Sequence, residues 1–154
     1  MNKFTLSACL SALLLAPTTP ASAQQVIIAG SLTLAGYRAS CGPIETVVME
    51  MYDIAESRDG RIFLNNKLMS RPRAQQMFWY THECAHHIFG AGEARADCWA
   101  VQQGRSHGWL TPDEFNLLGR AMISHSGTAA HAPGPQRVAA MRSCYNRDIY
   151  AAVN

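Results

Sequence analysis

The chain has 154 residues, of which 48% are hydrophobic and 16% are charged. This length indicates one domain, and this composition excludes a disordered chain. The formal net charge is +2, from 13 basic and 11 acidic residues with no run of like charge, so we do not expect a nucleic-acid-binding protein. No stretch has the roughly 20 apolar residues that a membrane-spanning helix needs, and we expect no integral membrane segment. The sequence leaves the oligomeric state open.

Residues 1–23 have the pattern of a secretory signal peptide. Lys3 gives a positive start, an uncharged apolar run follows, and residues 21–23 read A-S-A, a signal-peptidase cleavage site. The segment ending at Cys9 resembles a lipoprotein box, but the apolar stretch before it is too short for normal export. We therefore expect a single exported domain over residues 24–154, located in the periplasm or secreted.

The first half of this domain is predicted to form strands. Residues 26–34 are mainly apolar and β-branched, and residues 46–55 alternate in polarity. Residues 61–65 form a second short strand after the turn signal R-D-G at residues 58–60. We therefore expect a β-hairpin over residues 46–65.

The second half is predicted to form four helices. Ser70 is a suitable N-cap for the first helix, and residues 111–114 (T-P-D-E) form a capping box, with proline at the first helical position, at the start of the third. The segment G-A-G at residues 90–92 ends the first helix. The expected helices span residues 72–89, 93–105, 112–123 and 135–144. Strands followed by helices indicate an α+β fold.

Residues 82–86 read H-E-C-A-H, an HExxH motif within the first predicted helix. Residues four apart lie about 40° apart around a helix axis, so the rings of His82 and His86 point the same way and can bind one zinc ion. Glu83 lies beside them and can act as the general base that takes a proton from a water at the metal. The alternative is a pair of surface histidines on an amphipathic helix.

A catalytic zinc ion needs a third protein ligand and an open fourth position. If the turn at residues 90–92 reverses the chain, the next helix places Glu93 beside His86 and Asp97 beside His82. Glu93 is therefore the expected third ligand, and Asp97 is the expected acceptor for the free ring N–H of His82. The alternative for Glu93 is a favourable negative charge in the first turn of a helix.

Other ligand arrangements agree less well with the spacing. In the metzincin pattern, HExxHxxGxxH, a glycine turn brings in a third histidine, but here Gly90 comes one residue late and Gly92 stands at the ligand position. His87 points about 100° away from His86 on the helix. We therefore expect His87 at the surface or behind the ligands, not on the metal.

Residues 82–99, HECAHHIFGAGEARADCW, resemble the gluzincin metallopeptidases. The likeness is strongest to small neutral zinc metallopeptidases in which E-x-x-A-D-C follows HExxH. The resemblance implies a zincin-like core, with Glu93 as the third zinc ligand and Asp97 orienting a ligand histidine. Only residues 87–92 separate the two motif elements here, where larger relatives insert loops.

The C-terminal part has a looser likeness. Residues 131–133 (H-A-P), followed by Arg137, are similar to the T-H-P…R element near the active site of some gluzincins. There a histidine or arginine can face the oxyanion of the tetrahedral intermediate and stabilise its charge. The resemblance implies such a role for His131 and a supporting one for Arg137; the alternative is a loop histidine and a solvent-facing arginine. Gluzincins also bind substrate along an edge strand beside the zinc helix, and residues 46–65 are the candidate for it.

Four cysteines follow the predicted signal peptide, namely Cys41, Cys84, Cys98 and Cys144. An even number in an exported chain indicates two disulfides, for which three pairings are possible. Cys84 lies about 200° around the helix from His82, so it is a poor zinc ligand. One pairing, Cys84 with Cys98 and Cys41 with Cys144, would clamp the two zinc-bearing helices together.

The sequence thus predicts an exported zinc metallopeptidase that binds one Zn²⁺ per chain and hydrolyses a peptide or protein substrate. The alternatives are a zinc-binding protein without catalytic activity, a structural envelope domain stapled by disulfides, and a zinc amidase that acts on cell-wall peptides. A Glu83→Gln variant separates an enzyme from a binding protein, because only an enzyme would lose hydrolysis while it keeps its metal.

Overall fold

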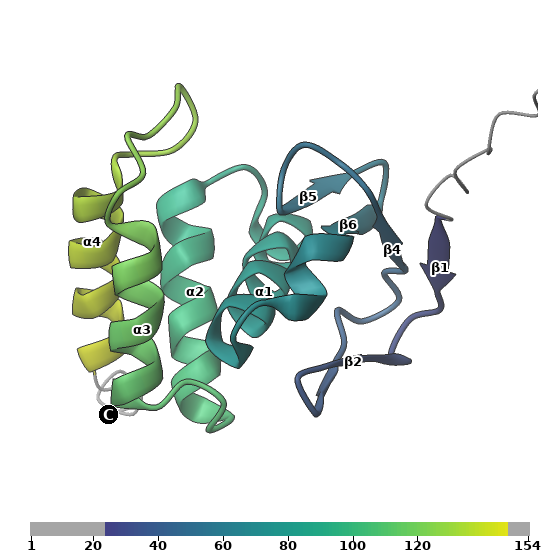
Figure 1. Ribbon diagram of the computed structural model, residues 1–154, viewed down its shortest axis with the longest axis horizontal. Coiled ribbons are helices and arrows are strands. Elements are labelled where there is room, and N and C mark those ends of the chain that lie inside the picture. Colours follow the sequence, from purple (N-terminus) through teal and green to yellow (C-terminus); the bar gives the residue numbers. More distant parts are fainter. Residues whose placement is uncertain (1–23, 148–154) are drawn as a thin grey trace, which may run out of the picture.

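The computed structural model describes residues 24–147. The predicted signal peptide lies outside the described residues, as do residues 148–154. Within the described part, short β-strands come first and four α-helices follow (Figure 1), which confirms the predicted α+β fold class. No helix in residues 24–147 is long and apolar enough to span a membrane.

The strands form two small sheets. The larger sheet has the order β1 (Gln25–Ile27), β4 (Thr46–Met49), β6 (Arg61–Asn65) and β5 (Ala55–Arg58). The pair β4–β6 is parallel, whereas β1–β4 and β5–β6 are antiparallel. A separate antiparallel pair consists of β2 (Leu32–Leu34) and β3 (Tyr37–Ala39).

The predicted hairpin over residues 46–65 is only partly right. The hairpin consists of β5 and β6, joined at Asp59 and Gly60, which both have positive φ as a two-residue hairpin turn requires. The strand β4 instead lies in the middle of the sheet and runs parallel to β6. Its residues Thr46, Val47 and Val48 are all buried, as is typical of a central strand that is covered on both faces. The polarity pattern of this segment is therefore that of a central strand, not of an edge strand.

The predicted strand at residues 26–34 is divided in two. The break is at Gly30, which has a φ of +74°, and the two halves, β1 and β2, belong to different sheets. A positive φ turns the chain sharply, and glycine adopts it without steric cost.

The helices are close to the predicted ranges. After a 3-10 helix, η1 (Asn66–Ser70), they are α1 (Arg73–Phe89), α2 (Glu93–Ser106), α3 (Pro112–Met122) and α4 (Gly134–Asn146). The capping box of α3 is present, with Thr111 and Glu114 each bonded to the other's backbone N–H. Ser70 is not an N-cap, because it ends η1 and α1 begins after Pro72 without a side-chain cap.

The helix α1 lies between the larger sheet and α2, α4 packs on α2, and α3 contacts both α1 and α4 (Figure 1). Buried side chains from all these layers belong to one hydrophobic cluster, including Leu64 of β6, Phe78 of α1, Phe115 of α3 and Met141 of α4. A helix packed on most of its sides is fixed in position and rotation. The HExxH motif is therefore carried by the central element of the fold.

Two disulfides connect the layers, but the pairing considered above is wrong. Cys41, just after β3, is bonded to Cys84 of α1, and Cys98 of α2 is bonded to Cys144 of α4. The physical reason lies in the direction of Cys84, which is opposite to His82 on α1 and so points away from α2. Two disulfides indicate that the protein folds in an oxidising, extracellular environment.

Candidate metal centre

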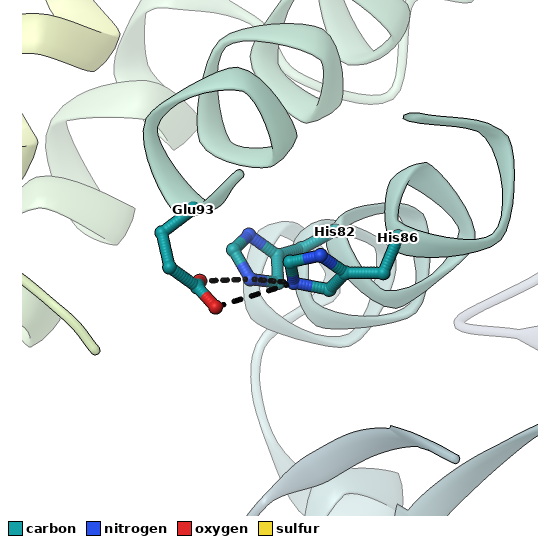
Figure 2. Close-up of side chains that lie close together, drawn as sticks. All are labelled: His82, His86 and Glu93. Atoms are coloured by element: carbon teal, nitrogen blue, oxygen red, sulfur yellow. Dashed lines mark hydrogen bonds and ion pairs between the residues drawn. The ribbon is translucent and has the colours of Figure 1, made fainter. Parts of the chain in front are cut away.

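The three predicted ligands come together where α1 turns into α2. Gly90 ends α1 with a φ of +80°, its N–H bonds to the carbonyl of His86, and α2 begins at Glu93. A residue with a positive φ leaves the helical conformation and redirects the chain, and glycine adopts such a φ without steric cost. As Figure 2 shows, the Glu93 side chain then reaches back from the start of α2 towards the rings of His82 and His86.

The donor atoms of this triad are close to one another. Nε2 of His82 lies 3.1 Å from Oε2 of Glu93 and 3.2 Å from Nε2 of His86, and Nε2 of His86 lies 3.6 Å from Oε1 of Glu93. Ligands bound tetrahedrally at about 2.1 Å lie roughly 3.4 Å apart. The spacing of the three donors therefore fits a zinc ion, and two imidazoles with one carboxylate form a ligand set that zinc accepts.

Each histidine has a partner for its other ring nitrogen. Nδ1 of His86 donates to the carbonyl of Gly90 at 3.0 Å. Nδ1 of His82 lies 2.9 Å from Oδ1 of Asp97, a short contact that is poorly aligned for a hydrogen bond. Partners on Nδ1 leave Nε2 of both rings directed at the metal position, as metal-binding histidines require.

Asp97 is fixed in turn by Arg137 of α4. The guanidinium donates two hydrogen bonds to the carboxylate, at 2.8 and 2.6 Å, and both side chains are almost fully buried. Burial raises the pKa of Asp97, but the bonds from Arg137 and the contact with His82 outweigh it, so the pKa is lowered and the carboxylate stays charged. Arg137 thus holds Asp97 in place from behind the triad, a position compatible with the supporting role that the resemblance implies.

The charges around His82 favour its protonation in the metal-free protein. Burial opposes the charged ring, but the carboxylates of Asp97 and Glu93 outweigh burial and raise the pKa of His82 to about 9. The pKa of Glu93 is lowered, because its contact with His82 outweighs the effect of burial. A proton on His82 and a metal ion compete for the same Nε2.

Glu83 and His131 lie beside the triad. The side chain of Glu83 is buried at the edge of the cleft described below, and burial raises its pKa. His131, in the loop between α3 and α4, places Nε2 2.8 Å from Oε2 of Glu93. The structure therefore brings both predicted catalytic residues to the triad, whereas His87 turns away and contacts Ser57 of β5.

A cleft of about 1090 Å³ opens at these residues. Its lining includes residues 52–57, which contain part of β5, and residues 124–128 and 130–132 of the loop between α3 and α4. Trp79, Glu83 and the triad are also part of the lining. Sequence reasoning missed the contribution of the loop residues other than His131, because small polar residues in a loop carry no pattern that distinguishes a cleft from a surface turn.

Comparisons with protein-family models, curated proteins and solved structures find no match to this chain. The assignment of a function therefore depends on the side chains of the triad and the cleft.

Proposed function

We propose that this protein is an exported zinc metallopeptidase with a zincin-like core of gluzincin type, acting in the periplasm or outside the cell. The observation that carries the proposal is the convergence of His82, His86 and Glu93 at zinc-ligand spacing, inside a cleft that also contains the buried carboxylate of Glu83. Three protein ligands and an open side are typical of a catalytic zinc site, whereas structural sites have four protein ligands.

His82, His86 and Glu93 would hold the ion, and Asp97 would keep the ring of His82 in place. When bound, zinc lowers the pKa of a coordinated water and polarises a carbonyl group. The pair Asp97–Arg137 is buried and present without a metal, which supports a ligand ring at His82 that is held in place in advance. When the ligand side chains are already ordered, metal binding costs less conformational entropy.

Glu83 would act as the general base and then as the acid. Its pKa is raised by burial, and a carboxyl whose pKa approaches the working pH can take up a proton and return it. In peptide hydrolysis it would take the proton of the attacking water and deliver it to the leaving amine. His131, which contacts Glu93 from the loop between α3 and α4, would donate a hydrogen bond to the negative charge that develops on the substrate carbonyl oxygen.

The substrate would be a peptide or protein that binds as an extra strand. In the described sheet β5 is the last strand beside β6, it packs on α1, and its residues Ala55, Glu56 and Ser57 line the cleft. An extended peptide can pair with the free edge of such a strand through main-chain hydrogen bonds. This places the peptide backbone between β5 and the triad.

The test uses the full-length chain, exported so that its disulfides form. With zinc bound, the wild type should hydrolyse peptides, and Glu83→Gln should lower kcat by about a thousandfold or more while it keeps its zinc. Glu50→Gln, a change at an exposed glutamate outside the cleft, serves as the matched control and should be unaffected. Zinc binding without hydrolysis would favour a non-catalytic zinc protein, and the absence of zinc binding would favour a structural envelope domain.

A further inference from the structure

The loop between α3 and α4 is closed on itself around Thr128. The hydroxyl oxygen of Thr128 accepts the backbone N–H groups of Ala130 at 3.2 Å and His131 at 3.0 Å. The N–H of Thr128 donates to the carbonyl of His131 at 2.9 Å. At its base the N–H of Gly134 donates to the carbonyl of His125 at 2.8 Å. These bonds connect Thr128 to the segment that carries His131 and close the base of the loop.

The hydroxyl of Thr128 also contacts the ring of His131. Its Oγ1 lies 3.3 Å from Nδ1 of His131. A hydroxyl has two acceptor lone pairs and one proton to donate. Since two backbone N–H groups already occupy the lone pairs, the proton is left for the ring. Nδ1 of His131 must then be the unprotonated nitrogen.

The other side of the ring leads to the same conclusion. Nε2 of His131 lies 2.8 Å from Oε2 of Glu93. An ionised carboxylate only accepts hydrogen bonds, so Nε2 must carry a proton. The contacts of the ring with Thr128 and with Glu93, at its two nitrogens, therefore both require the tautomer of His131 that has its proton on Nε2.

We propose that Thr128 is a positioning residue that fixes His131 in the tautomer with its proton on Nε2, directed at Glu93 and the cleft. His131 in this state offers an N–H donor beside the triad. The catalytic part of this inference rests on the proposed function, in which the N–H of His131 stabilises the negative charge that develops on the substrate carbonyl oxygen. The tautomer itself is a property of the metal-free protein.

The tautomer can be measured by ¹⁵N NMR on the metal-free full-length chain, exported with its disulfides formed. The ring nitrogens of histidine have well-separated shifts when protonated and unprotonated, and His131→Gln identifies the signals of His131. At a pH of about 8, above the ordinary histidine pKa of about 6.5, wild-type His131 should show a protonated Nε2 and an unprotonated Nδ1. Thr128→Val should give a mixture of tautomers, and Thr128→Ser should restore the wild-type signals.

A matched control is Thr33→Val, at an exposed threonine in β2 far along the chain from the loop, which should leave the His131 signals unchanged. A proton on Nδ1 in the wild type would overturn the proposal, as would a Thr128→Val spectrum identical to that of the wild type. Neither result depends on zinc or on hydrolysis, so they are distinct from a failure of the proposed function.

The role in turnover is tested on the zinc-loaded enzyme. Thr128→Val should lower kcat by about fivefold, the effect of one hydrogen bond, with KM and zinc content unchanged. In a His131→Gln background the same change should have no further effect, because both residues act through one interaction. Equal losses in both backgrounds would show that Thr128 affects turnover by another route and would contradict its positioning role.

Discussion

The two sides of the cleft support their functional side chains in different ways. On the helix side, His82 is 1% exposed, and its support, Asp97 and Arg137, comes from two other helices. On the loop side, His131 is 32% exposed and its support, Thr128, lies in the same loop. The geometry of the proposed metal ligands thus depends on packing across the core, whereas the position of His131 depends on a few hydrogen bonds within its own loop. Changes on the helix side should alter zinc affinity, and changes on the loop side should alter turnover.

The largest expected effect on zinc affinity comes from pH. Burial lowers the pKa of His82, but the carboxylates of Asp97 and Glu93 raise it by more, so that the pKa is about 9. A zinc ion that binds Nε2 of His82 has to displace this proton, so the proposed site should lose about tenfold in apparent zinc affinity for each pH unit below 9. Competition with a chromophoric chelator, corrected for the chelator's own protonation, measures this. An affinity that is constant between about pH 7 and 9 would contradict proton competition at His82.

The next largest effect should come from Asp97. Asp97→Asn removes the charge that lies against Nδ1 of His82, so it should lower zinc affinity by about 10- to 100-fold. Arg137→Met should act in the same direction, because it removes two hydrogen bonds to Asp97. Arg142→Met is the matched control, since the Arg142 guanidinium of α4 donates to Asn116 and is exposed. Circular dichroism shows whether each variant is folded; a folded Asp97→Asn protein with wild-type affinity would refute this support of His82.

The smallest effect on zinc affinity should come from the loop. His131→Gln should change the affinity by less than about threefold, because His131 contacts a ligand without being one, but it should lower kcat by about a hundredfold, as expected for a donor to a developing oxyanion. The two quantities are measured by chelator competition and by peptide hydrolysis. A large loss of affinity would instead make His131 a fourth ligand and would remove the distinction between the two sides.

The parts of the fold that local chemistry decides were predictable from the sequence. The four helices were placed to within two residues, because glycine and proline punctuation and the Thr111–Glu114 capping box mark their ends. The triad was predictable for the same reason: helical spacing sets His82 against His86, and a short turn brings in Glu93. These inferences need no knowledge of what lies across the core.

The parts that depend on distant segments were not predictable. The parallel pairing of β4 with β6 follows from where the chain returns after residues 50–54. The turn at Gly60 joins β5 to β6, whereas the sequence predicts a hairpin between the strand at residues 46–55 and β6. The cysteines of the two disulfides are 43 and 46 residues apart, and Arg137 and Asp97 are 40 residues apart. Sequence spacing carries no information about such contacts. Thr128 had no signal at all, because an exposed threonine in a small-residue loop is unremarkable in sequence.

The experiment that matters most is the zinc content of the exported, disulfide-bonded wild-type protein, measured beside a Glu93→Ala variant by atomic emission. The convergence of His82, His86 and Glu93 predicts about one zinc per chain in the wild type and a loss of most of it in the variant. A wild-type protein that takes up no zinc, even after incubation with it, would contradict the metal centre and with it the proposed peptidase. Zinc that is retained in full by Glu93→Ala would contradict the assignment of the third ligand.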